Sequence, residues 1–101
     1  MIWVSGWRLA AAVSEAGGLG LLGAGSMKPE ILRGHIRKLR RATNKPFGVN
    51  LPLLYKHMDA CIDVVLEEEV PILFSSAGSP AAVAERLRRA DRIHIHVVAA
   101  V

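Results

Sequence analysis

The hydrophobic and polar positions of the chain form two patterns that alternate along its length. Short apolar runs bounded by glycine or proline predict buried strands at residues 19–23, 47–51, 72–75 and 93–101. Between these runs, apolar residues recur every three or four positions, which predicts helices at residues 7–16, 29–43 and 58–69 and a fourth that follows residue 79. Strands that are apolar throughout are typical of parallel sheets that are covered on both faces.

Capping signals mark the predicted helix starts. Ser5 precedes the first helix, and Ser26 with Pro29 opens the second. Ser79 and Pro80 form the strongest signal, with serine as the cap and proline at the first helical position of the fourth helix. These signals support the helix assignments independently of the apolar spacing.

The predicted elements alternate as helix and strand, four of each, which indicates parallel βαβ units with right-handed crossovers. This order fits an open doubly wound sheet and also a (β/α) barrel. Four strands are half of an eight-stranded barrel, so this α/β pattern fits a partial (β/α)8 TIM barrel of about four βα units as well as it fits an open sheet. Such a half leaves two open sheet edges, which are a route to self-association.

The composition fits one domain over residues 1–101, because 51% of the 101 residues are hydrophobic and 22% are charged. Every apolar stretch is far shorter than the ~20 residues of a membrane-spanning helix. Cys61 is the single cysteine, so there is no intrachain disulfide, and the first residues lack the pattern of a signal peptide. We therefore expect a cytoplasmic protein with no membrane partner. The net charge of +4 does not identify a partner.

Residues 18–23 match the dinucleotide-binding pattern G-x-G-x-x-G letter for letter. That pattern binds a phosphate when it follows a strand and opens a helix. Here it follows a predicted helix and overlaps a predicted strand, and residues 43–45 (TNK) supply no acidic ribose-binding residue. We therefore expect these glycines to let a helix and a strand pack closely.

His94 and His96 are two residues apart in a predicted strand, so both side chains lie on one face. Two imidazoles are too few for a zinc site, which needs three or four ligands. Asp59, Cys61 and Asp63 lie on a predicted helix with no reason to converge there. We predict no metal site and expect one or both histidines to line the interior or the mouth of the barrel.

Two runs of charge fall on predicted helices. Glu67-Glu68-Glu69 ends the third helix. A basic run lies along the second helix and its end: Arg33, Arg37, Lys38, Arg40, Arg41 and Lys45. The basic run lacks the interleaved aromatic residues or recognisable module of a nucleic-acid-binding surface, so no nucleic-acid partner is expected. We expect both runs to be solvated helix surfaces, and Cys61 to be a small core residue.

In parallel α/β folds, ligands bind at the carboxyl ends of the strands. Asn50 lies near the end of its predicted strand and faces away from Phe47, Val49 and Leu51. Its amide offers donors and an acceptor together, which suits the imide-like edge of a heterocycle, but a role as a clamp of neighbouring backbone is equally open. The small residues that end at Gly78 follow the next strand and would let a flat ring approach closely.

Three motifs resemble the nitronate monooxygenase family, also called 2-nitropropane dioxygenase. They are residues 16–25 (AGGLGLLGAG), 45–51 (KPFGVNL) and 76–80 (SAGSP), and the likeness extends over essentially the whole chain. The resemblance implies a TIM barrel that binds FMN and oxidises alkyl nitronates with molecular oxygen, without a metal. The related flavin-dependent enoyl-acyl-carrier-protein reductases use NADH and the same flavin on an unsaturated acyl thioester.

Carried onto this chain, the resemblance implies that Asn50 hydrogen-bonds the flavin ring and that Gly78 lies beside it. In the family, the first strand typically ends in a methionine near the flavin, and Met1 resembles that methionine. The family's catalytic histidine follows two glycines, and that motif is matched by none of the four histidines of this chain: His35, His57, His94 and His96. The catalytic residues therefore stay unknown.

The likeness covers the amino-terminal half of the family's barrel. Its first strand, its phosphate-binding glycine loops and its catalytic-histidine segment have no counterpart in residues 1–101. We therefore expect a fragment of an FMN-dependent oxidoreductase that is inactive alone and binds FMN weakly. The alternative hypothesis is a non-enzymatic remnant or assembly module that binds no flavin.

Overall fold

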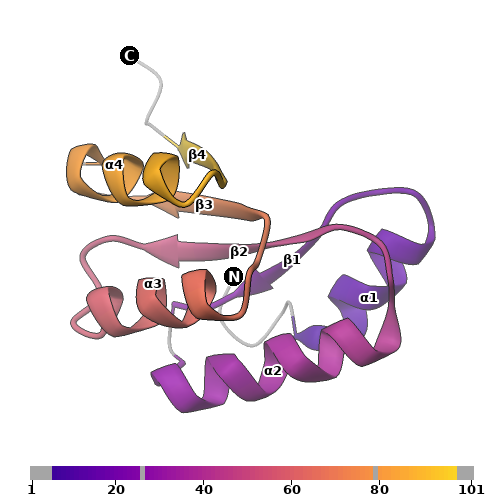
Figure 1. Ribbon diagram of the computed structural model, residues 1–101. Coiled ribbons are helices and arrows are strands. Elements are labelled where there is room, and N and C mark those ends of the chain that lie inside the picture. Colours follow the sequence, from indigo (N-terminus) through magenta and orange to yellow (C-terminus); the bar gives the residue numbers. More distant parts are fainter. Residues whose placement is uncertain (1–5, 26, 79, 98–101) are drawn as a thin grey trace.

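The computed structural model describes residues 6–25, 27–78 and 80–97 as four helices and four strands (Figure 1). The helices are α1 (Trp7–Glu15), α2 (Pro29–Ala42), α3 (Met58–Glu67) and α4 (Ala81–Arg89). The strands are β1 (Gly20–Gly23), β2 (Phe47–Pro52), β3 (Ile72–Ser76) and β4 (Ile93–Val97). All strands are parallel and lie in the order β1-β2-β3-β4, which confirms the predicted βαβ arrangement.

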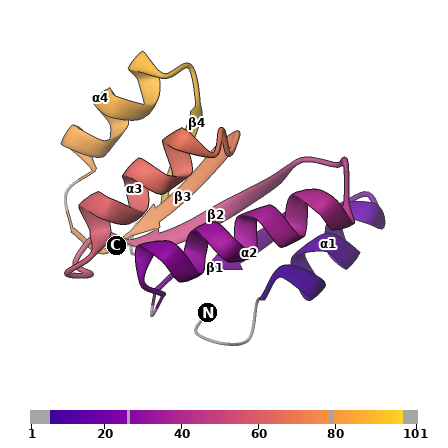
Figure 2. The ribbon, with the colours of Figure 1, turned by 60° about the horizontal axis from the view of Figure 1, so that its bottom comes forward.

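The helices cover one face of the sheet (Figure 2). On that face Leu22, Val49 and Leu73 lie side by side in the register of β1, β2 and β3, and none of them is accessible to solvent. The helices bury the apolar stripes that their spacing predicts: Leu32, Ile36 and Leu39 of α2, Ile62 and Val65 of α3, and Val83 and Leu87 of α4. Cys61 is also fully buried in this core, as expected.

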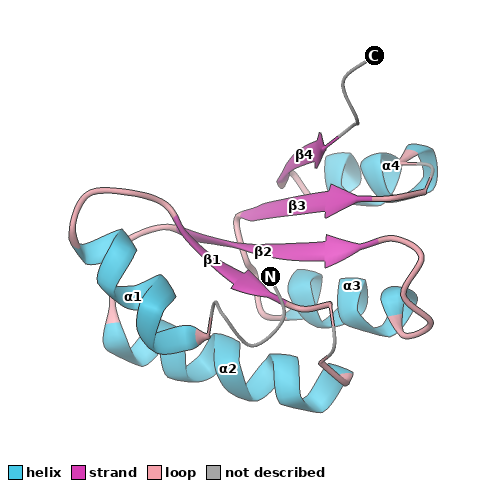
Figure 3. Ribbon diagram, turned by 180° about the vertical axis from the view of Figure 1, so that it is seen from behind, coloured by secondary structure: helices cyan, strands magenta, loops and turns pink. Residues whose placement is uncertain are grey.

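No described helix crosses the opposite side of the sheet, which we call the open face (Figure 3). Two rows of residues in register point to it: Leu21, Gly48, Ile72 and Ile93, and then Gly23, Asn50, Phe74 and Ile95. A parallel sheet with helices on one side and apolar residues on the other is a portion of a (β/α) barrel, whose interior the open face would line. The architecture therefore confirms the partial TIM barrel.

Gly20 explains the close contact between α1 and β1. A Cβ atom at this position would lie 2.0 Å from the carbonyl oxygen of Ala10 in α1. The backbone N–H of Gly20 donates to Ser14 Oγ at 3.0 Å, and Ser14 Oγ donates to the carbonyl of Pro46 at 2.8 Å. The glycine run thus packs a helix on a strand, as predicted, and does not open a helix as a dinucleotide-binding loop does.

The predicted helix starts differ from the structure in detail. Pro80 was predicted as the first helical residue of α4, but it is the N-cap residue, and the helix begins at Ala81. Lys28 and Gly6 cap α2 and α1, neither with a side-chain hydrogen bond. The predicted caps Ser5, Ser26 and Ser79, and the end of the last predicted strand at residues 98–101, lie outside the described residues.

Most residues of the two charge runs are exposed, as predicted, but the runs also pair with each other between α2 and α3. Arg33 donates to Glu67 at 2.5 Å and to Glu68 at 2.8 Å, and Arg37 donates to Glu68 at 3.2 Å. The side chain of Glu68 is only 11% exposed, and hydrogen bonds from Arg37 and Arg33 hold its pKa below the ordinary value. Sequence spacing could not show this pairing, because the partners are more than 30 positions apart.

Candidate functional site at the carboxyl edge of the sheet

Asn50 lies on the open face near the carboxyl end of β2, with Gly23 of β1 and Phe74 of β3 as its neighbours in register. Val49 and Leu51 on either side of it point into the helix-covered core and are fully buried, whereas Asn50 is half-buried. Its backbone carbonyl accepts a hydrogen bond from the N–H of Ala24 at 2.9 Å. Its position at the carboxyl edge agrees with the prediction from the sequence.

The side-chain amide of Asn50 makes no hydrogen bond with another described residue. A clamp would tie this amide to neighbouring backbone, and the described backbone groups receive no such bond. The two N–H donors and the oxygen acceptor of the amide are therefore not used by the described residues. This is the donor and acceptor set that a ring with an imide edge would meet.

Gly78 lies in the loop after β3, at the same edge of the sheet as Asn50. Its φ of +87° is in the left-handed region that favours glycine, and an added Cβ would lie 3.3 Å from Leu53 Cβ and 3.4 Å from Leu54 Cδ2. The N–H of Leu53 donates to the carbonyl of Ser76 at 2.8 Å, which joins the loop after β2 to the end of β3. The backbone conformation alone is thus sufficient reason for a glycine here.

Two apolar side chains at this edge were not singled out by the sequence. Phe74 is half-buried beside Asn50, and Leu54 in the loop after β2 is 78% exposed. Side chains alternate along a strand, so the sequence could have placed Phe74 on the face opposite Leu73. Its position beside Asn50 follows only once β2 and β3 are known to be neighbours. Together with Asn50 and Gly78 they place apolar surface beside an amide at this edge, a combination that small-molecule sites commonly have.

His94 and His96 face the helix-covered side of the sheet, so the expectation that they line the barrel interior or its mouth is wrong. They are in register with Leu73 and Ser75, which are fully buried on that side. Ser75 Oγ lies 2.6 Å from His94 Nε2 and 2.8 Å from His96 Nδ1. Burial, with the nearby His96 as a smaller cause, lowers the pKa of His94.

The residues that the structure describes contain no group of three metal-ligating side chains. No helix among them is long and apolar enough to cross a membrane.

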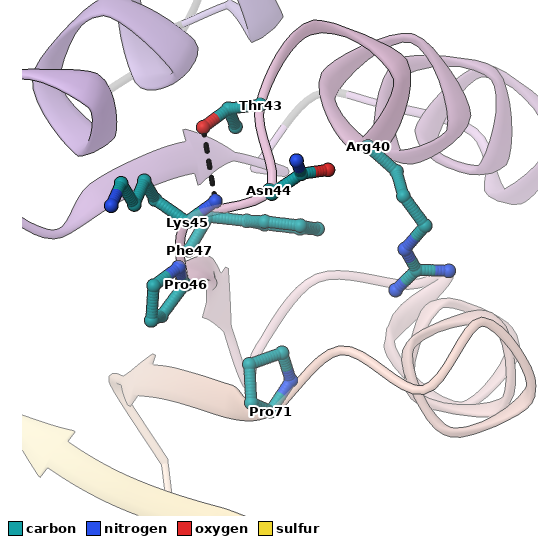
Figure 4. Close-up of a pocket in the computed structure, with 7 residues that line it drawn as sticks. All are labelled: Arg40, Thr43, Asn44, Lys45, Pro46, Phe47 and Pro71. Carbon is teal, nitrogen blue, oxygen red and sulfur yellow. Dashed lines mark hydrogen bonds between the residues drawn. The ribbon is translucent and has the colours of Figure 1, made fainter.

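A cavity of about 390 Å³ lies at the amino ends of β2 and β3, on the other edge of the sheet from Asn50 (Figure 4). Its lining comes from the end of α2, the loop before β2 and the residue before β3: Arg40, Thr43, Asn44, Lys45, Pro46, Phe47 and Pro71. Thr43 Oγ1 accepts a hydrogen bond from the N–H of Lys45 at 3.1 Å and donates to Glu15 at 2.5 Å. These bonds hold the turn into β2, and we assign the cavity to packing, because ligands of such folds bind at the carboxyl edge.

The fold just described defines the chain as a portion of a parallel (β/α) barrel, with Asn50 and Gly78 at the carboxyl edge of its sheet. A family model described as nitronate monooxygenase matches residues 1–61. The chain belongs to this family.

Individual relatives agree with the family match. The chain is 44% identical to a nitronate monooxygenase of Paraburkholderia phytofirmans, over 68% of this chain and 18% of that protein. It is 31% identical, over 99% of this chain and 28% of the relative, to a Mycobacterium tuberculosis protein named (3aS,4S,5R,7aS)-5-hydroxy-7a-methyl-1-oxo-octahydro-1H-indene-4-carboxyl-CoA dehydrogenase.

Two solved structures share the fold. FabK from Thermotoga maritima superposes with a TM-score of 0.96 and 46% identity, over 99% of this chain and 32% of FabK. Nitroalkane oxidase from Streptomyces ansochromogenes superposes with a TM-score of 0.84 and 29% identity, over 97% of this chain and 38% of the oxidase. The chain thus spans about a third, or less, of the length of the proteins it matches.

Proposed function

We propose that this chain forms part of a flavin-dependent oxidoreductase of the nitronate monooxygenase type, which oxidises alkyl nitronates with molecular oxygen. The observation that carries the proposal is the half-buried amide of Asn50, which stands at the carboxyl edge of the open face without a hydrogen-bonding partner among the described residues. The family match supports the assignment of the ligand as a flavin, and FMN is the form we propose.

The residues of the edge fit such a group. Asn50 would donate to and accept from the imide edge of the flavin ring, and Gly78 lacks a side chain that would obstruct the ring. Phe74 would cover part of the ring with apolar surface. When bound, the flavin supplies the electron transfer, and the residues named here bind it and exclude water.

We further propose that residues 1–101 are inactive on their own. The chain's histidines do not match the family's catalytic motif, and its glycine run packs α1 on β1. The described residues therefore supply binding groups for the ring, and we assign none of them to the catalytic step.

A second candidate activity is the reduction or oxidation of an acyl thioester. The basis is the higher identity and TM-score with FabK than with nitroalkane oxidase, and the carboxyl-CoA dehydrogenase among the relatives. Both activities would use the same flavin edge, so the choice between them depends on the substrate that the complete barrel accepts.

The role of Asn50 is tested in a chimaera in which residues 1–101 replace the matched segment of Thermotoga maritima FabK. Asn50→Ala removes one or two hydrogen bonds worth ~0.5–1.5 kcal/mol each, so the dissociation constant of FMN is expected to rise about tenfold. Asn44→Ala, an exposed asparagine at the other edge of the sheet, is the matched control and should leave it unchanged. Flavin fluorescence titration and thermal melts of each apoprotein are the measurements.

An unchanged dissociation constant with a lowered melting temperature for Asn50→Ala would make Asn50 a structural clamp and overturn the proposed role. The two activities are distinguished in the complete barrel protein that we propose these residues belong to. Turnover of an alkyl nitronate with oxygen favours the first, whereas NADH-dependent turnover of an unsaturated acyl thioester favours the second.

A further inference from the structure

The loop after β2, residues 53–57, is fastened to the segments on both sides of it at the carboxyl edge of the sheet (Figure 3). On one side, the N–H of Leu53 donates to the carbonyl of Ser76 at the end of β3, at 2.8 Å. On the other side, the hydroxyl of Tyr55 donates to the carbonyl of Met27, which follows β1, at 2.9 Å. The loop therefore connects the carboxyl ends of three neighbouring strands.

The ring of Tyr55 places the hydroxyl for this contact. It is half-buried against the hydrophobic core, and its edge meets the ring of His57 at a centroid distance of 5.3 Å. The hydroxyl then reaches a carbonyl 28 positions earlier in the chain. Met27 is only 4% exposed, and its carbonyl has one further, longer contact with Cys61 Sγ at 3.7 Å. The Tyr55 hydroxyl is therefore the main donor to this carbonyl.

Hydrogen bonds of the backbone continue from Met27 to Asn50. The N–H of Met27 donates to the carbonyl of Ala24 at 3.2 Å, and the N–H of Ala24 donates to the backbone carbonyl of Asn50 at 2.9 Å. Ala24 directly follows Gly23, which is the neighbour of Asn50 in register. The Tyr55 hydroxyl therefore holds backbone that lies immediately beside Asn50.

We propose that Tyr55 is a positioning residue of the flavin site, which acts by holding the backbone of Ala24 and Met27 in place beside Asn50. This inference rests on the proposed function, because it takes Asn50 as the residue that binds the ring. The Asn50 amide has no partner among the described residues, so the backbone around it limits where a ring can lie. A bound group is held precisely only where such surrounding contacts are themselves fixed.

Tyr55→Phe tests the role, because it removes the hydroxyl and keeps the ring. In the chimaera with FabK we expect the dissociation constant of FMN to rise about three- to tenfold, the effect of one lost hydrogen bond. The visible circular dichroism of the bound flavin should also change, because it reports the surroundings of the ring.

Thr43→Val is the matched control. Its hydroxyl also joins distant segments, since it accepts from the N–H of Lys45 and donates to Glu15, but at the other edge of the sheet. We expect this variant to lower the melting temperature of the apoprotein and to leave the dissociation constant of FMN and the flavin spectrum unchanged.

Hydrogen exchange in the purified chain tests the first step without flavin. In Tyr55→Phe the amides of Ala24 and Met27 should exchange faster, whereas the amide of Val49 in the core of β2 should keep its wild-type rate. Unchanged exchange at Ala24 and Met27 would overturn the inference.

The inference is also overturned if Tyr55→Phe lowers the melting temperature but leaves the dissociation constant of FMN and the flavin spectrum unchanged, because the contact is then structural only. In that case Asn50→Ala still weakens FMN binding, and the proposed function stands. If Asn50→Ala leaves FMN binding unchanged as well, the proposed function fails and the positioning role fails with it.

Discussion

At the scale of single residues, the buried hydroxyl of Ser75 has two imidazoles as its hydrogen-bonding partners. It can donate its one proton to His94 Nε2 or His96 Nδ1 and accept a proton from the other ring. This arrangement needs at least one neutral ring, because two imidazolium ions would leave the hydroxyl without an acceptor. The lowered pKa of His94 agrees with this requirement.

The stability of the chain should therefore decrease on acidification. The folded-state pKa of His94 lies below the ordinary value of 6.5, so the unfolded chain binds more protons as the pH falls through and below 6.5. His35, whose pKa is lowered mainly by burial, contributes in the same direction. Melting temperatures measured from about pH 8 to about pH 5 should fall, and less steeply for His94→Gln. Equal slopes for the variant and the wild type would exclude His94 as a source.

At the scale of secondary-structure elements, the contact of α1 with β1 depends on the absence of a side chain at residue 20. Gly20→Ala would place a Cβ against the backbone of α1, 2.0 Å from the oxygen and 2.7 Å from the carbon of the Ala10 carbonyl. Because backbone cannot move aside as a flexible side chain does, we expect a loss of ~3 kcal/mol or more in the free energy of unfolding.

Gly34→Ala is the matched control for this prediction. Gly34 lies in α2, and a Cβ there would meet no atom within 4 Å. Alanine is the better helix former, so this variant should gain ~0.5–1 kcal/mol. Urea unfolding of both variants measures the two effects, and equal destabilisation by both would contradict the proposed contact.

At the scale of the whole molecule, we propose that the open face binds the flavin ring, while the glycine loops that the family uses for the phosphate have no match in the sequence. Because backbone amides and helix N-termini contribute much of the binding of a nucleotide phosphate, we expect the chain alone to bind FMN weakly and to purify colourless. The absorbance spectrum of the purified chain and a fluorescence titration with FMN are the measurements. Purification with stoichiometric yellow flavin would show that the phosphate site lies within these residues.

The two histidines of β4 show a prediction from the sequence that was wrong. The spacing of His94 and His96 correctly placed both on one side of β4, but assigned them to the wrong side. Side chains alternate between the two faces of β4, with the histidines on one face and Ile93, Ile95 and Val97 on the other. From the sequence, either face could be the one that the helices cover. The hydrogen bonds with the buried Ser75 show that the histidines are on the face that the helices cover. Ser75 lies about twenty positions away from them in the sequence.

The sequence by itself determined the local elements and the family. Short apolar runs placed the described strands, and the period of three to four residues placed the buried stripes of the helices, because both patterns reflect local backbone geometry. The motifs around Gly20, Asn50 and Gly78 indicated the nitronate monooxygenase family. Only the tertiary structure decided which face of β4 the helices cover, that Arg33 and Arg37 pair with Glu68, and that the Asn50 amide has no described partner. These features depend on contacts between residues far apart in the chain, which local spacing does not encode.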